Sequence, residues 1–195
     1  MNKENLIITI VSILIVLAIG FYLFYSPDDS TLTYNDFNFQ RGVDGFYYVE
    51  LNTMFGDQIV PFYYHPNNLT NIDFNKTALD ALRQIQLNDG NVKIAIDAEF
   101  KNDSHIIVAG VEISKITGRV FGMPTTSAFT QPIGDVNKSY TCEDANNSSF
   151  VILFNKSNEK NIQYTNFCTI LNAPNGKDAI MLADLFVFSA LGVMK

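Results

Sequence analysis

The sequence predicts an α+β domain behind an N-terminal membrane anchor. Three observations lead to this prediction: an uncharged apolar run near the start, aromatic and β-branched segments with strand periodicity, and segments whose apolar residues recur at helical spacing. The chain has 195 residues, so the part after the apolar run has room for one domain of ordinary size. We expect a mixed or antiparallel sheet and about three helices.

Residues 6 to 25, LIITIVSILIVLAIGFYLFY, carry no charge. Twenty residues span roughly 30 Å as a helix, which is the thickness of a bilayer core. A cleaved signal peptide is the alternative, because Ala18 and Gly20 are small enough to precede a cut, but its apolar region is normally only about 7 to 15 residues long. The weak charge bias around the run puts residues 1 to 5 in the cytoplasm and the domain outside. We therefore expect a single-pass anchor that stays in the cell membrane.

The polar residues 26 to 44 are expected to form a short stalk, and residues 45 to 195 an extracytoplasmic domain. The domain begins with GFYYVELN (45 to 52) and QIVPFYY (58 to 64), two strand-like segments separated by a turn, which predicts a hairpin. Pro61 has no N–H to donate to a neighbouring strand, so the second strand is expected at an edge of its sheet.

A helix and a strand are expected next. KTALDALRQIQLNDG, residues 76 to 90, has Thr77 and Asp80 spaced as a capping box and Gly90 as a stop. Residues 91 to 100 alternate between apolar and polar side chains, which predicts a strand with one buried face. The expected buried face of the helix consists of Ala78, Ala81, Leu82 and Ile85.

The second half of the chain is expected to add two helices and another hairpin. Residues 104 to 118 fit a helix, although β-branched residues dominate the segment. Residues 149 to 156 and 161 to 171 flank a polar turn and predict a hairpin. The last segment, residues 175 to 195, is a helix that is apolar almost all round, with Asp184 on its narrow polar stripe. Such a helix is buried on several sides.

Cys142 and Cys168 are the two cysteines of the chain. Outside a cell two lone cysteines usually pair, and this loop closure would stabilise by about 3 to 4 kcal/mol. If residues 139 to 171 formed a simple meander, the two cysteines would lie two strand spacings apart, near 10 Å. A disulfide tolerates at most about 7 Å between Cα atoms, so it requires EDANNS to be a loop that carries Cys142 back over the hairpin. A disulfide is the first choice; buried free thiols and a catalytic or metal-binding cysteine are the alternatives.

Asp97, Glu99 and His105 are the candidate residues for chemistry. The two carboxylates share a face at the end of an expected strand, with the imidazole a short loop away, and strand ends in α/β sheets are common sites for metal binding or acid–base work. A solvated strand end is the simpler interpretation, because the chain has two histidines and no second metal-ligand spacing. We therefore assign no catalytic residue and no metal.

His65 and Pro66 follow the expected edge strand. A peptide-binding edge is one interpretation of this position, and a turn that ends the strand is the more ordinary one. The chain has no G-x-S-x-G, phosphate loop, G-x-G-x-x-G or H-E-x-x-H motif. We accordingly predict no cofactor and lean against an enzyme.

Charge excludes one class of partner. The chain has 13 basic and 20 acidic residues, and the first 25 residues hold one of each, Lys3 and Glu4, so the remaining 12 and 19 still give a net charge of −7. An acidic surface repels phosphate backbones, so nucleic acid is not an expected partner. An external domain offers candidate glycosylation sites at its sequons, although chance matches are common in an Asn-rich chain. These are Asn68, Asn75, Asn102, Asn137, Asn146, Asn147 and Asn155.

The succession GFYYVELN, VPFYYHPNNLTNI, TCEDA, NFCTI and a terminal ADLFVFSALGVM resembles a set of single-span, membrane-anchored proteins from small-genome archaea of the DPANN type. The resemblance covers most of the chain after Tyr25. It implies an archaeal envelope as the setting and a recurring pattern for Cys142 and Cys168, but no activity and no catalytic residue.

The expected function is to bind or position another envelope component. The expected partners are the membrane, through residues 6 to 25, and a protein at the envelope. One alternative is a membrane-tethered hydrolase or metal-dependent enzyme that uses Asp97, Glu99 and His105. Another is an assembly subunit whose final apolar helix docks against membrane-spanning partners.

Overall fold

The computed structural model describes residues 15–17, 19–20, 31–53, 56–72, 74–134 and 137–194. The chain divides into two compact units, residues 1–30 and 31–195. In the first unit residues 15–17 and 19–20 are helical, and the rest of the predicted anchor and the predicted cytoplasmic residues 1 to 5 lie outside the described residues. A search limited to the described residues finds no helix long and apolar enough to cross a membrane.

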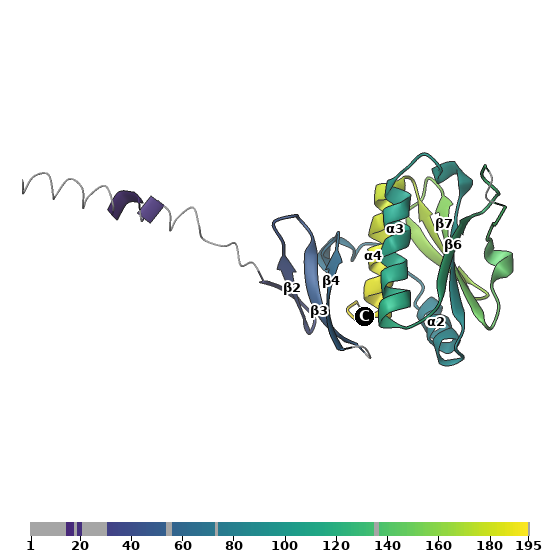
Figure 1. The fold of residues 1–195 in the computed structure, drawn as a ribbon, viewed down its shortest axis with the longest axis horizontal. Helices are drawn as coiled ribbons and strands as arrows, with labels where there is room; N and C mark the ends of the chain where they lie inside the picture. Colours follow the sequence, from purple (N-terminus) through teal and green to yellow (C-terminus); the bar gives the residue numbers. More distant parts are fainter. Residues whose placement is uncertain are drawn as a thin grey trace, which may run out of the picture. The chain divides into compact units, whose positions relative to one another are not determined.

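The second unit is an α+β fold with two sheets where the sequence predicted one (Figure 1). The first sheet, which we call the meander, has four antiparallel strands in chain order. The predicted hairpin is confirmed, and its second strand lies at an edge. The strands are β1 (Thr31–Tyr34), β2 (Phe37–Arg41), β3 (Tyr47–Thr53) and β4 (Gly56–Phe62).

Residues 31 to 41 differ from the prediction of a stalk over residues 26 to 44, because they form β1 and β2. Phe39 explains why: it is fully buried and pairs with Val49 of β3. Tyr34 and Phe37 also pack against the core but are only partly buried.

The second sheet, which we call the mixed sheet, has five strands in the order β6-β5-β7-β9-β8. Its first four strands are parallel, and β8 lies antiparallel to β9 at the edge. Parallel neighbours need crossover connections, and the segment between β5 and β6 supplies one through a helix. The strands are β5 (Asn91–Ile96), β6 (Thr125–Phe129), β7 (Ser149–Lys156), β8 (Asn161–Thr165) and β9 (Cys168–Ala173).

The second predicted hairpin is wrong in its pairing. Residues 161 to 171 contain two strands, β8 and the start of β9, separated by Asn166 and Phe167, which both have positive φ angles of 42° and 63°. A two-residue turn of this kind suits a tight hairpin, but a phenylalanine there gives no sequence signal. As a result, β9 rather than β8 lies beside β7.

The helices of this unit are α2 (Thr77–Leu87), α3 (His105–Ser114), its π-helical continuation η3 (Lys115–Val120), and α4 (Gly176–Ala190). The predicted buried face of α2 is confirmed, but the capping box is wrong, because Thr77 is already helical and its N–H donates to the Asn75 side chain at 3.0 Å. The helix predicted over residues 104 to 118 is confirmed and runs on through η3.

The last helix is buried from two sides, as its composition predicted. On the meander side, the Phe188 ring lies 5.7 Å from Phe39 and 4.3 Å from Phe62, measured between ring centroids. On the mixed-sheet side, Phe186 stacks on Phe150 at 6.4 Å. Figure 1 shows α3 and α4 between the two sheets. Because α4 is enclosed, the interpretation that it docks against membrane-spanning partners is wrong.

Candidate functional site

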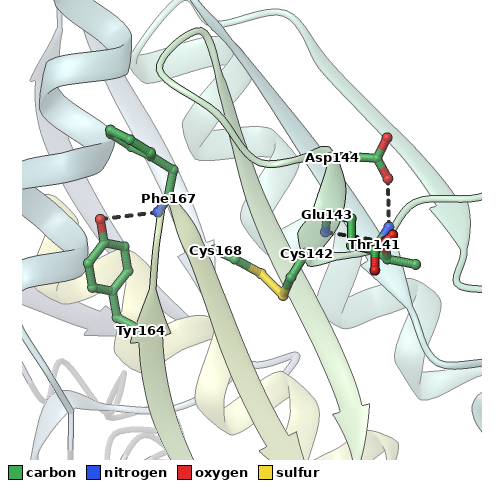
Figure 2. Close-up of a disulfide and its surroundings, with 7 residues drawn as sticks. All are labelled: Thr141, Cys142, Glu143, Asp144, Tyr164, Phe167 and Cys168. Carbon is green, nitrogen blue, oxygen red and sulfur yellow. Dashed lines mark hydrogen bonds between the residues drawn. A yellow bond between two sulfur atoms is a disulfide. The ribbon is translucent and has the colours of Figure 1, made fainter.

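Cys142 and Cys168 form a disulfide (Figure 2), with their Cα atoms 5.4 Å apart. Cys168 is the first residue of β9 and pairs with Val151 of β7, so it lies one strand spacing from the chain that follows Cys142. The distance objection assumed a strand through Cys142, with β7 between the two cysteines, and Cys142 does not lie in a strand. Cys142 opens a 3-10 turn, Cys142–Asp144, that carries the chain back over the sheet, as the disulfide required.

The turn that holds Cys142 is fixed by a reciprocal cap. The Thr141 hydroxyl accepts from the Glu143 N–H at 3.2 Å, and the Asp144 carboxylate accepts from the Thr141 N–H at 2.8 Å. The bridge lies against a small apolar cluster on the face of the mixed sheet away from the helices, with Ala95, Tyr140 and Val151. The two cysteines are therefore a structural staple rather than reactive thiols, and a structural disulfide indicates an oxidising compartment.

Asp97, Glu99 and His105 are not brought together. β5 ends at Ile96, and Asp97 caps the 3-10 turn Ala98–Phe100 by accepting the Glu99 N–H at 3.0 Å. The other Asp97 oxygen accepts the Lys156 N–H at 3.3 Å. The His105 ring pairs instead with Asp103, at 3.1 Å between Nδ1 and Oδ1. Within the described ranges, no group of three or more His, Cys, Asp or Glu side chains is placed to hold a metal ion.

The seven sequons differ in accessibility. Asn155, on β7, is half-buried, and its side-chain amide donates to Asn172 Oδ1 at 2.7 Å, so a glycan there would break a contact between neighbouring strands. The other six asparagines are exposed. Asn155 is therefore the least favourable of the seven candidate glycosylation sites.

A buried acidic residue at the centre of α4 is the main feature that the sequence interpretation missed. Asp184 is fully buried, where the pattern suggested only a polar stripe. Its Oδ2 accepts the N–H groups of Tyr63 and Tyr64, just after β4, at 3.0 and 2.9 Å. Its Oδ1 has no hydrogen-bond donor among the described residues, and the Glu112 carboxyl of α3 lies within hydrogen-bonding reach of Asp184. An aspartate in the middle of an apolar run is the signal that could have revealed it.

Glu112 is held in turn by Lys115, the first residue of η3. Their ion pair is largely shielded from water, with 7% of the Glu112 side chain and 15% of the Lys115 side chain exposed. The Lys115 ammonium also donates to the Pro61 carbonyl and lies 4.7 Å from the centre of the Phe62 ring. We call Asp184, Glu112 and Lys115 the buried acid cluster; it joins α4 and α3 to the meander.

Burial dominates the electrostatics of this cluster. It raises the pKa of Asp184 well above its usual range, and the charge of Glu112 and the hydrogen bond to it raise this pKa further. Burial also raises the pKa of Glu112, which the neighbouring Lys115 ammonium opposes. The Tyr64 N–H and Lys115 pull the Asp184 pKa the other way but do not outweigh burial.

His65, just after β4, is a second buried titratable group and lies against aromatic rings of the meander. Its ring is surrounded by Tyr34, Phe39 and Tyr47, at 6.1, 5.0 and 5.4 Å between ring centroids. Nδ1 accepts the Asn67 N–H at 3.3 Å, and Nε2 is buried without a hydrogen-bond partner among the described residues. Burial lowers the pKa of this imidazole. His65 caps the short turn after β4, which supports a turn that ends the strand.

The hollows on the described surface of this unit include two open ones. One, of about 600 Å³, covers the outer face of the meander and is lined by Gln40, Tyr48 and Glu50, among others. The other, of about 580 Å³, lies between α2 and the ends of η3 and α4, where Arg83, Phe121 and Leu191 line it.

Comparison of the chain with protein-family models, curated proteins and solved structures finds no match.

Proposed function

We propose that the chain is a membrane-anchored, extracytoplasmic protein that binds or positions another envelope component through the outer face of the meander. The apolar residues 6 to 25 support the anchor, and the disulfide supports an oxidising location for the domain. The archaeal setting rests on the sequence resemblance alone. The observation that carries the proposal is the hollow on the outer face of the meander.

The two faces of the meander have different roles. The inner face is packed against the helices through buried Phe39, Val49 and Val60. The outer face carries amides, carboxylates and the Tyr48 ring, together with Ile59, whose side chain is 70% exposed. A large apolar side chain and a ring among polar neighbours is the composition of a protein contact surface with a few central anchors.

The enzyme alternative has weaker support from the same structure. Asp97 is engaged by two backbone N–H groups, and His105 is paired with Asp103 rather than with Asp97 or Glu99. A hydrolytic or metal-dependent centre needs its groups within reach of one reacting atom or ion.

Site-specific photo-crosslinking in intact cells that produce the full chain tests the proposed surface. A crosslinking residue is placed at Gln40 or Glu50 on the outer face, at Arg83 in the second hollow, and at exposed Gln163 on β8 as a matched control. We expect a discrete adduct from Gln40 and Glu50 that is absent from Gln163. Adducts from Arg83 alone would move the contact surface to the second hollow, and equal labelling at all four positions would contradict a specific contact.

The anchor is tested separately by fractionation and protease treatment. We expect the full chain to remain with membranes after alkaline extraction, and its domain to be digested by protease added outside intact cells. Release by alkali would contradict the anchor, and protection of the domain until lysis would contradict the external location.

A further inference from the structure

The buried acid cluster holds more potential negative charge than positive charge. Two carboxyl groups, Asp184 and Glu112, face one ammonium, Lys115, and all three are largely or wholly removed from water. An unpaired carboxylate in a protein interior is strongly disfavoured, and the group takes up a proton instead. This imbalance of charge favours a proton on one of the two carboxyl groups.

The position of that proton follows from the partners of each carboxyl. Glu112 has the ammonium of Lys115 against it, which favours the carboxylate. Asp184 forms no ion pair among the described residues; its Oδ2 accepts two N–H groups, and its Oδ1 is the oxygen without a donor there. A proton on Oδ1, donated to Glu112, satisfies this oxygen and removes the repulsion between the two carboxyls.

The groups that face the cluster from outside it belong mainly to the meander and the segment after it. The meander supplies the N–H groups of Tyr63 and Tyr64 and the carbonyl of Pro61, all next to or within β4. Burial and the charges of Glu112 and Asp184 raise the pKa of the Tyr63 phenol, and burial and the charge of Asp184 raise the pKa of the Tyr64 phenol, so neither ionises more easily than an ordinary tyrosine. Asp178 lies in the first turn of α4, and its charge also raises the pKa of the Tyr64 phenol.

We propose that Asp184, Glu112 and Lys115 form a proton-dependent latch that holds the end of β4 on the helix layer. The latch is closed while Asp184 is a neutral acid that bridges Glu112 and the Tyr63 and Tyr64 amides. Loss of the Oδ1 proton to solvent leaves two adjacent buried carboxylates with one cation. The cluster then gains from opening to water, and the segment after β4 is released. This proposal does not depend on the contact surface proposed above.

The direction of the pH effect follows from the raised pKa of Asp184. A carboxyl whose pKa is higher in the closed state than in the open state binds its proton more tightly when closed. The latch is therefore fully stabilising below the ordinary carboxyl range near pH 4 and weakens as pH rises toward the pKa of the buried acid. Between these two pKa values the population of the open form increases up to tenfold for each pH unit, and above the pKa of the buried acid it levels off.

Hydrogen exchange of the Tyr63 and Tyr64 amides measures the opening directly in the full chain. Rates are converted to protection factors, because intrinsic exchange is itself catalysed by base. In the wild-type protein we expect protection of these two amides to fall as pH rises from 6 to 10. The Val151 amide, which donates to the Phe167 carbonyl in the mixed sheet, is expected to stay constant. Constant protection at Tyr63 and Tyr64 across the range overturns the proposal, whichever variants fold.

Asp184→Asn is the decisive variant, because an asparagine amide reproduces the shape and hydrogen bonds of the protonated acid. Its oxygen accepts both tyrosine amides and its NH₂ donates to Glu112. We expect Asp184→Asn to fold and to protect the Tyr63 and Tyr64 amides at pH 6 as well as the wild type does. This protection should no longer depend on pH. A carboxylic-acid infrared band that the wild type shows at pH 7 should be absent from the variant. Asp97→Asn is the matched control, because Asp97 also accepts two backbone N–H groups but is partly exposed.

Glu112→Gln distinguishes the latch from the opposite assignment of the proton. It leaves Lys115 buried without a negative partner, so we expect at least a tenfold loss of protection at Tyr63 and Tyr64 at every pH. If Glu112→Gln is the variant that folds normally and abolishes the pH dependence, while Asp184→Asn opens the segment, the proton is on Glu112 and the proposal is wrong.

Discussion

The meander and the mixed sheet bury their strands in different ways. In β3 of the meander, Val49 and Leu51 face inward and Glu50 faces solvent, so one face is packed and the other is free. In β7 of the mixed sheet, four successive residues from Ser149 to Ile152 are buried, because the helices cover one face and the disulfide segment covers the other. This is the difference expected between antiparallel and mainly parallel sheets.

The two sheets are also secured differently. One hydrophobic core includes buried residues of both sheets, and the mixed sheet also has a covalent staple. Links from the meander to the helix layer include the Phe188 ring contacts, the buried acid cluster, and a hydrogen bond from Asn35 to the Val193 carbonyl at 2.6 Å. The difference shows that two sheets sharing one core can be secured by different additional contacts: a disulfide on the mixed sheet, and buried polar and titratable groups on the meander.

The largest effect is expected from Phe188→Ala. It removes the ring that packs on Phe39 and Phe62, so we expect a loss of about 3 to 5 kcal/mol in the free energy of unfolding. Denaturant titration measures the loss, and hydrogen exchange is expected to show it first in the meander. Leu87→Ala, at an exposed position of α2, should change stability by less than about 0.5 kcal/mol. If the mixed sheet loses hydrogen-exchange protection before the meander does, then Phe188 does not act mainly by attaching the meander to the helices.

The next largest loss of stability is expected from removing the disulfide, which lies on the mixed sheet. Cys142→Ser with Cys168→Ser opens a loop of 26 residues and is expected to cost about 3 to 4 kcal/mol. Exchange in β7 and β9 should rise more than exchange in the meander. Thiol labelling of denatured protein with and without reductant, followed by mass spectrometry, verifies the bond. Labelling of both cysteines before reduction would contradict the staple and the oxidising location that it indicates.

The sequence predicts the meander hairpin better than the mixed sheet, and contact range explains why. β3 and β4 are neighbours in the chain, and their turn and alternation are local signals. The pairing of β9 with β7 depends on a turn at Asn166 and Phe167 that has no compositional signature, so a simple hairpin is the natural but wrong expectation.

The candidate sites also differ in whether local sequence signals could predict them. Two lone cysteines predict a disulfide from chemistry alone, whereas Asp97, Glu99 and His105 were grouped because a strand was expected to continue to residue 100. The role of Asp184 was missed because it depends on two amides and a carboxyl from elements far away in the sequence. Long-range polar contacts of this kind have no periodicity to reveal them.

A smaller effect is expected from His65 at acid pH. Burial holds the folded-state pKa below the ordinary value of 6.5, so the stability from the neutral ring is complete above pH 6.5 and is lost as pH falls below it. Asp184 changes stability in the opposite direction over this range, so the prediction concerns a difference: from pH 7 to pH 5 the wild type should lose stability relative to His65→Phe, which keeps a ring among Tyr34, Phe39 and Tyr47. His105→Gln leaves His65 in place and should keep the acid sensitivity. An identical acid profile in wild type and His65→Phe would exclude His65 as its source.

The smallest effect is expected at Asp97, which can be compared with Asp184. Both aspartates accept two backbone N–H groups, but their surroundings differ. Asp97 accepts two N–H groups at the end of β5, as Asp184 does after β4, but Asp97 is partly exposed and has no second carboxyl against it. Asp97→Ala should cost only about 1 kcal/mol, the usual value of a lost cap, and Asp97→Asn still less. Thermal unfolding of both variants at pH 6 and pH 9 should show the same small change at each pH. A large or pH-dependent loss from Asp97→Asn would mean that the charge at the end of β5 has a role beyond capping, and would return Asp97, Glu99 and His105 to consideration as a reactive group.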